Sequence, residues 1–408
     1  MTDPALAEAV RVLSTGTEHV VPDGGLAEKL ALGRPLRVKL GVDPTSSDLH
    51  IGHAVVFRLL RRFQELGHTA VLIIGDFTAQ VGDPSGRSAT RPRLTKDEVE
   101  RHAATYLDQA AKILLPDNLE IRRNSEWLAS MGVEDVLGLM ARTTVARMLE
   151  RDDFKKRYES GTPISVMEFL YPLLQGWDSV AIESDVELGG TDQLFNCLMG
   201  RSLQEQMGQA PQVVMTVPLL EGLDGVRKMS KSYDNYVGID EPASNQFGKL
   251  MKIADEMMPR YFTLTTGWHP DRIDEVNRSI ADGSLKPVDA KRLLARTVVD
   301  LYHGEGAGAA AEGAFDQVFK EGARPESIDE VAIDAAEFVD GQVRLARVLA
   351  LAFPAAVPSN KEGARKIAQG GVKLEGERID DAEAVFDALA LNGKVLQLGK
   401  RNWARVRA

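Results

Sequence analysis

The chain has 408 residues, 44% hydrophobic and 27% charged, which is the composition of a packed globular protein with room for two or three domains. Its start lacks a basic segment followed by an apolar run, and no stretch approaches the roughly 18 apolar residues of a membrane-spanning helix. The single cysteine, Cys197, excludes an internal disulfide framework and a cysteine-based zinc site. We therefore expect a cytoplasmic protein without a membrane segment.

The net charge of −11 is distributed unevenly. Residues 341–408 carry 12 Lys/Arg and 7 Asp/Glu, a net of +5, which leaves a net of −16 for residues 1–340. A local excess of positive charge can attract a polyanion even when the whole chain is acidic. The tail is therefore a candidate nucleic-acid-binding module.

The first clear elements are a buried strand at 36–42 (LRVKLGV), an amphipathic helix at 53–67 and an apolar, β-branched strand at 69–77. This order is typical of a right-handed βαβ unit with parallel strands. Ligands of such sheets bind beyond the carboxyl ends of the strands, where the loop DPTSSDLHIGH (43–53) lies. The loop is therefore a candidate site.

Farther along the chain, residues 92–165 have a charged helical pattern, which we interpret as an insertion between two halves of the sheet. The segment 213–220 (VVMTVPLL) predicts a late strand, and helical patterns dominate from 241 to about 320. Residues 321–338 are acidic and contain Pro325, which is typical of a linker.

His50 and His53 flank Gly52 at the predicted start of the first helix, and three interpretations are open. A zinc site needs a further ligand, yet none of the other five histidines lies in a ligand-like cluster. A phosphate site fits better, since a helix N-terminus offers free N–H groups, Gly52 permits close approach and Thr45 can donate. Alternatively, Asp48 caps the helix and both histidines are incidental.

The sequence KMSKS (228–232) lies in a glycine-containing loop after the late strand. Lys228 and Lys231, with two serine hydroxyls, can close over a polyphosphate and neutralise charge on a leaving group. A solvated basic turn is the alternative. The presence of HIGH (50–53) upstream in a parallel α/β domain favours phosphate binding by both motifs.

HIGH and KMSKS in this order resemble the motifs of class I aminoacyl-tRNA synthetases. The resemblance implies a Rossmann-like catalytic domain that joins an amino acid to ATP, accompanied by Mg²⁺, and then to tRNA, with no tightly bound cofactor or resident metal. It implies catalytic roles for Thr45, His50, His53, Lys228 and Lys231. The ATP-binding residues that it implies are Gly41, Asp43, Gly52, Gly190, Asp192, Met229, Ser230 and Ser232.

The segment YPLLQGWD (171–178) helps to identify the amino acid that such an enzyme would bind. Pro172 disfavours helix at Tyr171, so a helix starts or kinks there, and Gln175 and Asp178 then lie one turn apart on one face. An ordinary capped core helix is the alternative. A buried carboxylate is nevertheless costly to leave unpaired, and a phenol hydroxyl is a natural donor for Asp178.

Together with GDPSGR (82–87) and GGTDQ (189–193), this segment resembles the tyrosine pocket of the tyrosyl-tRNA synthetase family. The resemblance implies that Asp178 binds the phenol hydroxyl and that Gln193 faces the carboxyl end of the substrate. It implies ammonium binding by Asp83, Tyr171 and Gln175, ribose binding by Gly190 and Asp192, and a place for Asp43 between amino acid and nucleotide.

Lys39 departs from the family pattern, because many relatives carry a tyrosine there that gives the substrate hydroxyl a second partner. We include Lys39 among the tyrosine-pocket residues. It either approaches Asp178 and keeps that carboxylate ionised or points to solvent.

Residues 358–379 predict a helix stopped by Gly370 and Gly371 and followed by a short hairpin. A solvated basic face is the common explanation for such a segment. It also resembles the small RNA-binding module shared with a ribosomal small-subunit protein, whose contacts with RNA phosphates would dominate affinity. The predicted RNA-binding residues are Arg365, Lys366 and Lys373.

The resemblance also implies a homodimer with the region near 120–165 at its interface, and tRNA(Tyr), L-tyrosine and ATP as partners.

A tryptophanyl enzyme shares both motifs, but Asp178 and the basic tail argue against it. An inactive synthetase-like RNA-binding regulator is the other alternative, and the intact motifs argue against it. The implied organisation is an N-terminal helical segment (1–34), a catalytic domain (35–240) with the insertion, an anticodon-side helical domain (241–320), a linker (321–340) and an α+β RNA-binding module (341–408).

Overall fold

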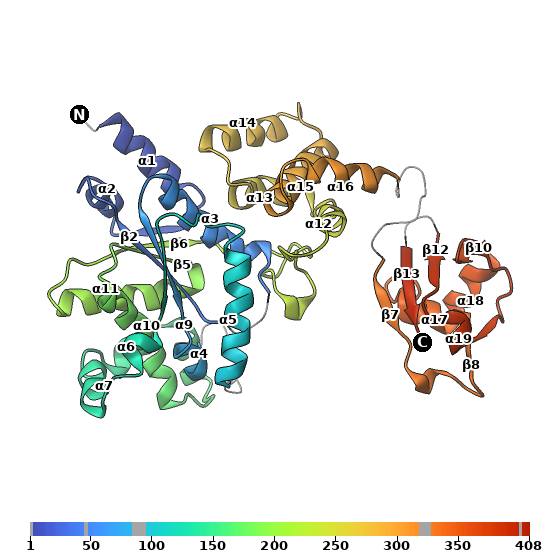
Figure 1. Ribbon diagram of the computed structural model, residues 1–408, viewed down its shortest axis with the longest axis horizontal. Helices are drawn as coiled ribbons and strands as arrows, with labels where there is room; N and C mark the ends of the chain where they lie inside the picture. Colours follow the sequence, from blue (N-terminus) through green and yellow to red (C-terminus); the bar gives the residue numbers. More distant parts are fainter. Residues whose placement is uncertain (1–2, 45–47, 84–94, 318–327, 400–401) are drawn as a thin grey trace. The chain divides into compact units, whose positions relative to one another are not determined.

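The computed structural model describes residues 3–44, 48–83, 95–317, 328–399 and 402–408 (Figure 1). The chain divides into two compact units, one formed by Met1–Glu241 with Lys249–Tyr302 and the other by Pro242–Gly248 with His303–Ala408. Within the described ranges, no helix combines the length and the hydropathy that crossing a membrane would require.

The first unit is built on a six-stranded sheet in the order β1-β6-β5-β2-β3-β4. All neighbouring strands are parallel except β1, which runs antiparallel to β6. The parallel α/β fold predicted from the sequence is therefore confirmed. The strands are β1 (His19–Val21), β2 (Arg37–Val42), β3 (Thr69–Ile74), β4 (Leu119–Arg123), β5 (Val186–Gly190) and β6 (Val213–Val217).

Helices connect the parallel strands in the predicted way. Helix α3 (Ile51–Glu65) joins β2 to β3 and buries Leu59, Leu60 and Phe63 at helical spacing. Helix α10 (Leu170–Ala181) precedes β5, and α11 (Leu194–Gln206) joins β5 to β6. The helix predicted to start or kink at Tyr171 is thus α10, which begins one residue earlier.

The strand order reverses between β2 and β5. From β2 the chain continues outward to β3 and β4, whereas from β5 it continues the other way to β6. Loops that leave the carboxyl ends of two such strands diverge and leave a crevice, the usual ligand site of doubly wound sheets. Here the crevice is bordered by Gly41 near the end of β2, by Asp43 directly after it and by Gly190 at the end of β5.

Two helical expectations need correction. The segment 1–34 contains β1 between α1 (Pro4–Ser14) and α2 (Gly25–Leu30), and the region 92–165 contains β4, which pairs with β3. Strand β1 has three residues, and the edge strand β4 has the mixed sequence LEIRR with no fully buried residue, so neither shows an apolar run. The other elements of 92–165 are α5 (Lys96–Ala110), α6 (Ser125–Leu128), α7 (Val133–Met140), α8 (Val145–Met148) and α9 (Asp152–Glu159).

After β6 the chain is mainly helical, as its pattern predicts. The helices are α12 (Ala243–Leu250), α13 (Met258–Thr265), α14 (Pro270–Ala281), α15 (Pro287–His303) and α16 (Ala307–Asp316).

The C-terminal part of the second unit holds a sheet in the order β10-β9-β12-β13-β7 around a core that includes Val348, Ile367 and Leu396. The predicted helix and hairpin at 358–379 are confirmed as α18 (Asn360–Ala368), β9 (Val372–Leu374) and β10 (Glu377–Arg378). Strand β7 (Glu330–Ala332) pairs with β13 (Asn402–Arg407), so these three residues belong to the sheet and not to a linker. The remaining elements are β8 (Gln342–Arg344), α17 (Leu345–Ala352), β11 (Val385–Asp387), α19 (Ala388–Leu391) and β12 (Val395–Leu398).

Candidate active site

Two cavities lie at the carboxyl ends of β2 and β5, with volumes of about 600 Å³ and 400 Å³. They share lining residues from α3, from the end of β5 and from the KMSKS loop, so they form one continuous site. The first cavity collects the predicted residues Gly41, Asp43, His53, Asp83, Tyr171, Gln175, Asp178, Gly190, Asp192, Gln193, Lys228, Ser230 and Ser232. The second adds His50, Gly52, Met229 and Lys231.

The HIGH turn forms the first turn of α3. His50 is the N-cap residue, and its Nδ1 accepts a hydrogen bond from the His53 backbone N–H at 3.4 Å, while the two rings stack with centroids 3.7 Å apart. The capping role proposed for Asp48 is therefore wrong. A Cβ on Gly52 would lie 3.0 Å from His50 Nδ1, so glycine makes room for the capping ring.

Both histidines are neutral at pH 7. Burial, then the neighbouring His53 and Lys231, lower the pKa of His50 to about 2. Burial, then Lys231 and Lys228, lower the pKa of His53 to about 4. The rings can therefore donate hydrogen bonds to phosphate oxygens as neutral imidazoles, and the lysines supply the positive charge. The position of Thr45 lies outside the described residues.

The KMSKS loop is held next to this turn. The side chain of Asn235 accepts a hydrogen bond from Ser230 N at 2.8 Å and donates to Lys228 O at 3.2 Å, which fixes the loop backbone. Lys231 forms an ion pair with Asp48, and Lys228 lines both cavities. The ammonium groups of Lys228 and Lys231 thus line the same cavity as the histidine rings that can donate hydrogen bonds to a phosphate.

Asp178 lies in the first cavity with only 3% of its surface exposed. Its carboxylate accepts hydrogen bonds from Trp127 Nε1 at 2.8 Å and from Asn124 Nδ2 at 3.4 Å. Burial raises the pKa of Asp178 to about 7, against the opposing influence of Lys39. In its ionised form this carboxylate keeps lone pairs that can accept a hydrogen bond from a substrate hydroxyl.

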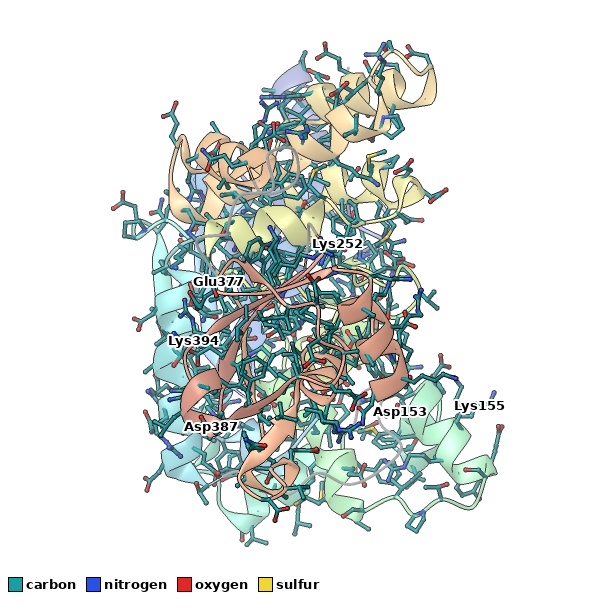
Figure 2. All side chains as sticks on the ribbon, turned by 90° about the vertical axis from the view of Figure 1, so that its right-hand side faces the viewer. Asp153, Lys155, Lys252, Glu377, Asp387 and Lys394 are labelled. Carbon is teal, nitrogen blue, oxygen red and sulfur yellow. The ribbon has the colours of Figure 1, made fainter. Side chains whose placement is uncertain are left out.

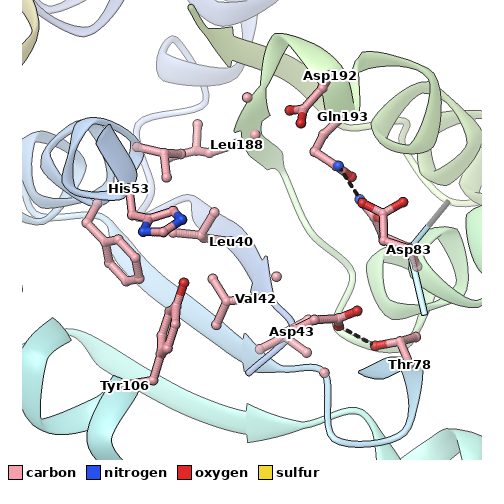
Figure 3. Close-up of a pocket in the computed structure, with 18 of the residues that line it drawn as sticks. Leu40, Val42, Asp43, His53, Thr78, Asp83, Tyr106, Leu188, Asp192 and Gln193 are labelled. Atoms are coloured by element: carbon pink, nitrogen blue, oxygen red, sulfur yellow. Dashed lines mark hydrogen bonds between the residues drawn. The ribbon is translucent and has the colours of Figure 1, made fainter. Parts of the chain in front are cut away.

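Asp43, directly after β2, is a second acid of the site and is half-buried. It accepts hydrogen bonds from Thr78 Oγ1 at 2.7 Å and from the Tyr171 hydroxyl at 2.9 Å, and burial raises its pKa to about 7. A Cβ on Gly75 would lie 2.0 Å from Asp43 Oδ1, so only glycine fits there. Figure 3 shows Asp43 and Thr78 joined on one side of the cavity, apart from Asp83 and Gln193.

Carboxamides line the wall between these acids. Gln193 Nε2 donates to Asp83 at 2.9 Å, and Asn196 Nδ2 donates to Gln193 Oε1 at 2.9 Å and to Gln175 Oε1 at 3.1 Å. Asn196 in turn accepts from Arg151 Nη1 at 3.0 Å.

The assignment of Lys39 to the tyrosine pocket needs correction. Lys39 is fully buried and does not line either cavity, so the alternative in which it points to solvent is also wrong. Its ammonium group binds Glu187 at 2.8 Å and Ser179 Oγ at 2.8 Å. It influences Asp178 only by its charge, without a direct hydrogen bond.

Sequence reasoning missed several polar residues that support the site. A tryptophan three residues after an asparagine in NSEW (124–127), and an asparagine three residues after Gln193, were signals that could have been used. Thr78 carried no signal. The missed residues are Thr78, Asn124, Trp127, Arg151, Glu187 and Asn196.

The predicted RNA-binding residues, here called the tail cations (Arg365, Lys366 and Lys373), lie on α18 and β9. Arg365 and Lys373 are exposed, and Lys366 is partly buried. Arg365 and Lys366 both lie within ion-pair distance of Glu362, which offsets part of their charge. Figure 2 shows acidic and basic side chains of this module, such as Glu377, Asp387 and Lys394, projecting from its surface.

Comparison with known proteins agrees with this geometry. The family described as "tRNA synthetases class I (W and Y)" matches residues 31–320. The chain is 49% identical to a tyrosine–tRNA ligase of Oleidesulfovibrio alaskensis, over 98% of each chain. It is 48% identical to one of Geobacter sulfurreducens, over 98% of this chain and 99% of the relative.

Solved structures support the fold. The tyrosyl-tRNA synthetase of Archaeoglobus fulgidus, determined with L-tyrosine, superposes with a TM-score of 0.63 at 22% identity, over 75% of this chain and 99% of that one. A C-terminally truncated mitochondrial tyrosyl-tRNA synthetase of Aspergillus nidulans gives the same TM-score and identity, over 77% and 94%. With the HIGH turn, the KMSKS loop and the carboxamide-lined cavity assembled at one sheet edge, the chain belongs to the tyrosine–tRNA ligases of the class I aminoacyl-tRNA synthetase family.

Proposed function

We propose that the chain activates L-tyrosine with ATP to give tyrosyl-adenylate and pyrophosphate, and then transfers tyrosine to the 3′ end of tRNA(Tyr). The observation that carries this proposal is Asp178, a buried acid in the first cavity whose two donors, Trp127 and Asn124, leave capacity for one more hydrogen bond. Sequence identity of 48–49% to tyrosine–tRNA ligases, over 98% of this chain, supports it.

The proposed amino-acid subsite is the first cavity. Asp178 accepts a hydrogen bond from the phenol hydroxyl, and the ammonium group meets Asp83, Tyr171 and Gln175. Gln193 then faces the carboxylate, near the end of β5. The donors and acceptors are held by their own hydrogen bonds before substrate arrives, so little ordering is needed on binding.

The proposed nucleotide subsite is the second cavity. Asp192, whose pKa is raised by burial, and Gly190 meet the ribose, while the neutral imidazoles of His50 and His53 meet the α-phosphate. The tyrosine carboxylate attacks that phosphorus and pyrophosphate departs. Lys228 and Lys231 neutralise the charge that develops on it, so catalysis rests on positioning and electrostatic stabilisation.

Mg²⁺ would enter as a complex with ATP, where it neutralises phosphate charge. Among the described residues, no group of three or more His, Cys, Asp or Glu side chains is arranged to hold a metal ion. The proposal therefore assigns no protein ligand to the cation.

The chain is proposed to act as a homodimer, with α7, α8 and α9 near the interface. Several large apolar side chains of this region are exposed, including Val133 (77%), Leu137 (59%) and Val145 (62%). Such a surface is typical of a protein–protein contact. The tail cations are proposed to contact tRNA phosphates, and a cytoplasmic location stays a prediction.

The test is amino-acid-dependent exchange of labelled pyrophosphate into ATP in the presence of Mg²⁺. Exchange with tyrosine, and not with phenylalanine or tryptophan, is expected. Exchange with tryptophan would support adenylate formation but contradict the assignment of tyrosine as the substrate. The absence of exchange with all three would favour the inactive RNA-binding alternative.

A further inference from the structure

The buried pair Lys39–Glu187 lies next to the amino-acid subsite without lining it. The two residues are paired across the parallel strands β2 and β5, and their side chains are 0% and 1% exposed. The Lys39 ammonium binds Glu187 Oε1 at 2.8 Å, Ser179 Oγ at 2.8 Å and Gln175 O at 2.9 Å. All three ammonium protons are therefore used inside the protein.

Glu187 is surrounded by donors. Besides Lys39 it accepts from Ser179 Oγ at 3.0 Å, from Gln212 Nε2 and from Gln175 Nε2 at 3.3 Å. A carboxylate paired with an ammonium can only accept, so the amino group of the Gln175 carboxamide must point toward Glu187. The Gln175 carbonyl oxygen then points the other way and accepts a hydrogen bond from Asn196 Nδ2 at 3.1 Å, in a residue that lines the first cavity.

A second charge fixes the other end of this network. Arg151 can only donate, and its Nη1 donates to Asn196 Oδ1, so the Asn196 amino group must point at the oxygens of Gln175 and Gln193. The Gln193 amino group consequently faces Asp83. The two orientations of a carboxamide differ little in shape. The charged groups at the two ends of the network, Glu187 with Lys39 and Arg151, therefore determine which orientation each carboxamide adopts.

We infer that Lys39 and Glu187, together with Arg151, are positioning residues that hold the Gln175 carbonyl oxygen in the cavity as an acceptor for the substrate ammonium group. This inference rests on the proposed function and deepens it. It also gives Lys39 a role different from that of the tyrosine found in many relatives, because Lys39 acts through Glu187 and Gln175 and does not contact the phenol.

The test is the double variant Lys39→Met with Glu187→Gln. Removing both charges avoids a lone buried charge, which would cost several kcal/mol. Glutamine at 187 can donate as well as accept, so Gln175 is free to turn its amino group toward the cavity. A matched control removes another buried ion pair in the same unit, Arg157→Met with Glu168→Gln, which lies outside both cavities.

The readouts are dissociation constants for three ligands, measured by calorimetry on the full-length proteins. L-Tyrosine and tyrosinol carry an ammonium group, whereas 3-(4-hydroxyphenyl)propionate has the same phenol and no ammonium. The double variant should bind the first two about tenfold to 100-fold more weakly, as expected for losing a hydrogen bond to a charged group. At pH 8, above the pKa of Asp178, its affinity for 3-(4-hydroxyphenyl)propionate should change much less than its affinity for the other two ligands. In pyrophosphate exchange the KM for tyrosine should rise while the KM for ATP stays constant.

Thermal unfolding of every variant is measured first, and the double variant Lys39→Gln with Glu187→Gln, which also leaves no buried charge, serves if the first double variant does not fold. Equal weakening for all three ligands would mean that the pair only maintains the shape of the pocket, and would overturn the inference. Unchanged binding of all three would overturn it too, as would the same ligand-specific loss in the Arg157/Glu168 control. A wild-type protein that binds neither tyrosine nor tyrosinol would instead overturn the proposed function.

Discussion

Lowering the pH from 8 to 6 should weaken tyrosine binding about tenfold. The pKa of Asp178 is raised by burial to about 7, so this acid takes up a proton over that interval. For such a pKa the ionised fraction falls from about 0.9 to about 0.1, which corresponds to about 1.4 kcal/mol of binding free energy if only the ionised carboxylate accepts the hydrogen bond of the phenol hydroxyl. Phenylalanine has no hydroxyl to donate, so its binding should not weaken, and discrimination between the two amino acids should narrow.

The assay is the dissociation constant for each amino acid at pH 6, 7 and 8, measured by calorimetry in wild type and in Asp178→Asn. Asp43 has a pKa in the same range, so Asp43→Asn is measured alongside. A wild-type constant for tyrosine that does not change between pH 6 and 8 would refute the reasoning. The same pH dependence in Asp178→Asn would assign the titration to another group.

The stability of the ligand-free protein provides an independent check on the same pKa. Because the folded-state pKa of Asp178 lies above its ordinary value of 3.8, the folded protein binds this proton more tightly than the unfolded chain does, and stability falls as the pH rises from about 4 to 7. The shift corresponds to at most about 4 kcal/mol. Asp178→Asn should therefore raise the unfolding temperature at pH 8 and leave it nearly unchanged at pH 5.

Three further predictions concern other parts of the molecule. Asp48→Asn should lower the KM for ATP by a few fold, since it releases Lys231 from a partly exposed ion pair worth less than about 1 kcal/mol; an unchanged or higher KM would contradict this. Gly75→Ala should abolish tyrosine-dependent pyrophosphate exchange, because its Cβ displaces Asp43, and exchange at the wild-type rate would show that the turn can relax. Replacing the tail cations with glutamine should weaken tRNA binding and flatten its salt dependence in filter-binding assays without changing pyrophosphate exchange, and an unaltered salt slope would exclude them from the RNA contact.

Much of the fold could be predicted from the sequence because its main signals are local. The segment 69–77 contains a continuous apolar run at 70–75, the segment 36–42 is apolar except for Arg37 and Lys39, and the helix between them shows a clear apolar face. The three-residue β1 and the charged edge strand β4 form because partner strands are available, which no local pattern reports. The buried parallel strands β2, β3 and β6 were predicted, whereas the short β1 and the exposed β4 were missed, and β5 was not predicted as a strand although it is buried.

The site could be predicted to a similar degree. The positions of the HIGH and KMSKS motifs in the site could be predicted because each motif is a short, continuous stretch of sequence. The partner of Lys39 is 148 residues away and is selected by the register of two parallel strands, so the local sequence around Lys39 could not identify it. The donors to Asp178, Trp127 and Asn124, lie about 50 residues upstream in a charged segment and reach the acid only in the folded structure.

The HIGH turn is joined by backbone hydrogen bonds to the segment after the KMSKS loop. Ile51 N donates to Val237 O at 2.9 Å, Ile239 N donates to Leu49 O at 3.1 Å, and His50 pairs with Gly238. During synthesis the first motif therefore leaves the ribosome long before the residues that hold it in place. A nascent chain that ends before residue 237 would contain all six strands of the sheet but lack these hydrogen bonds, so ATP binding should begin only late in translation.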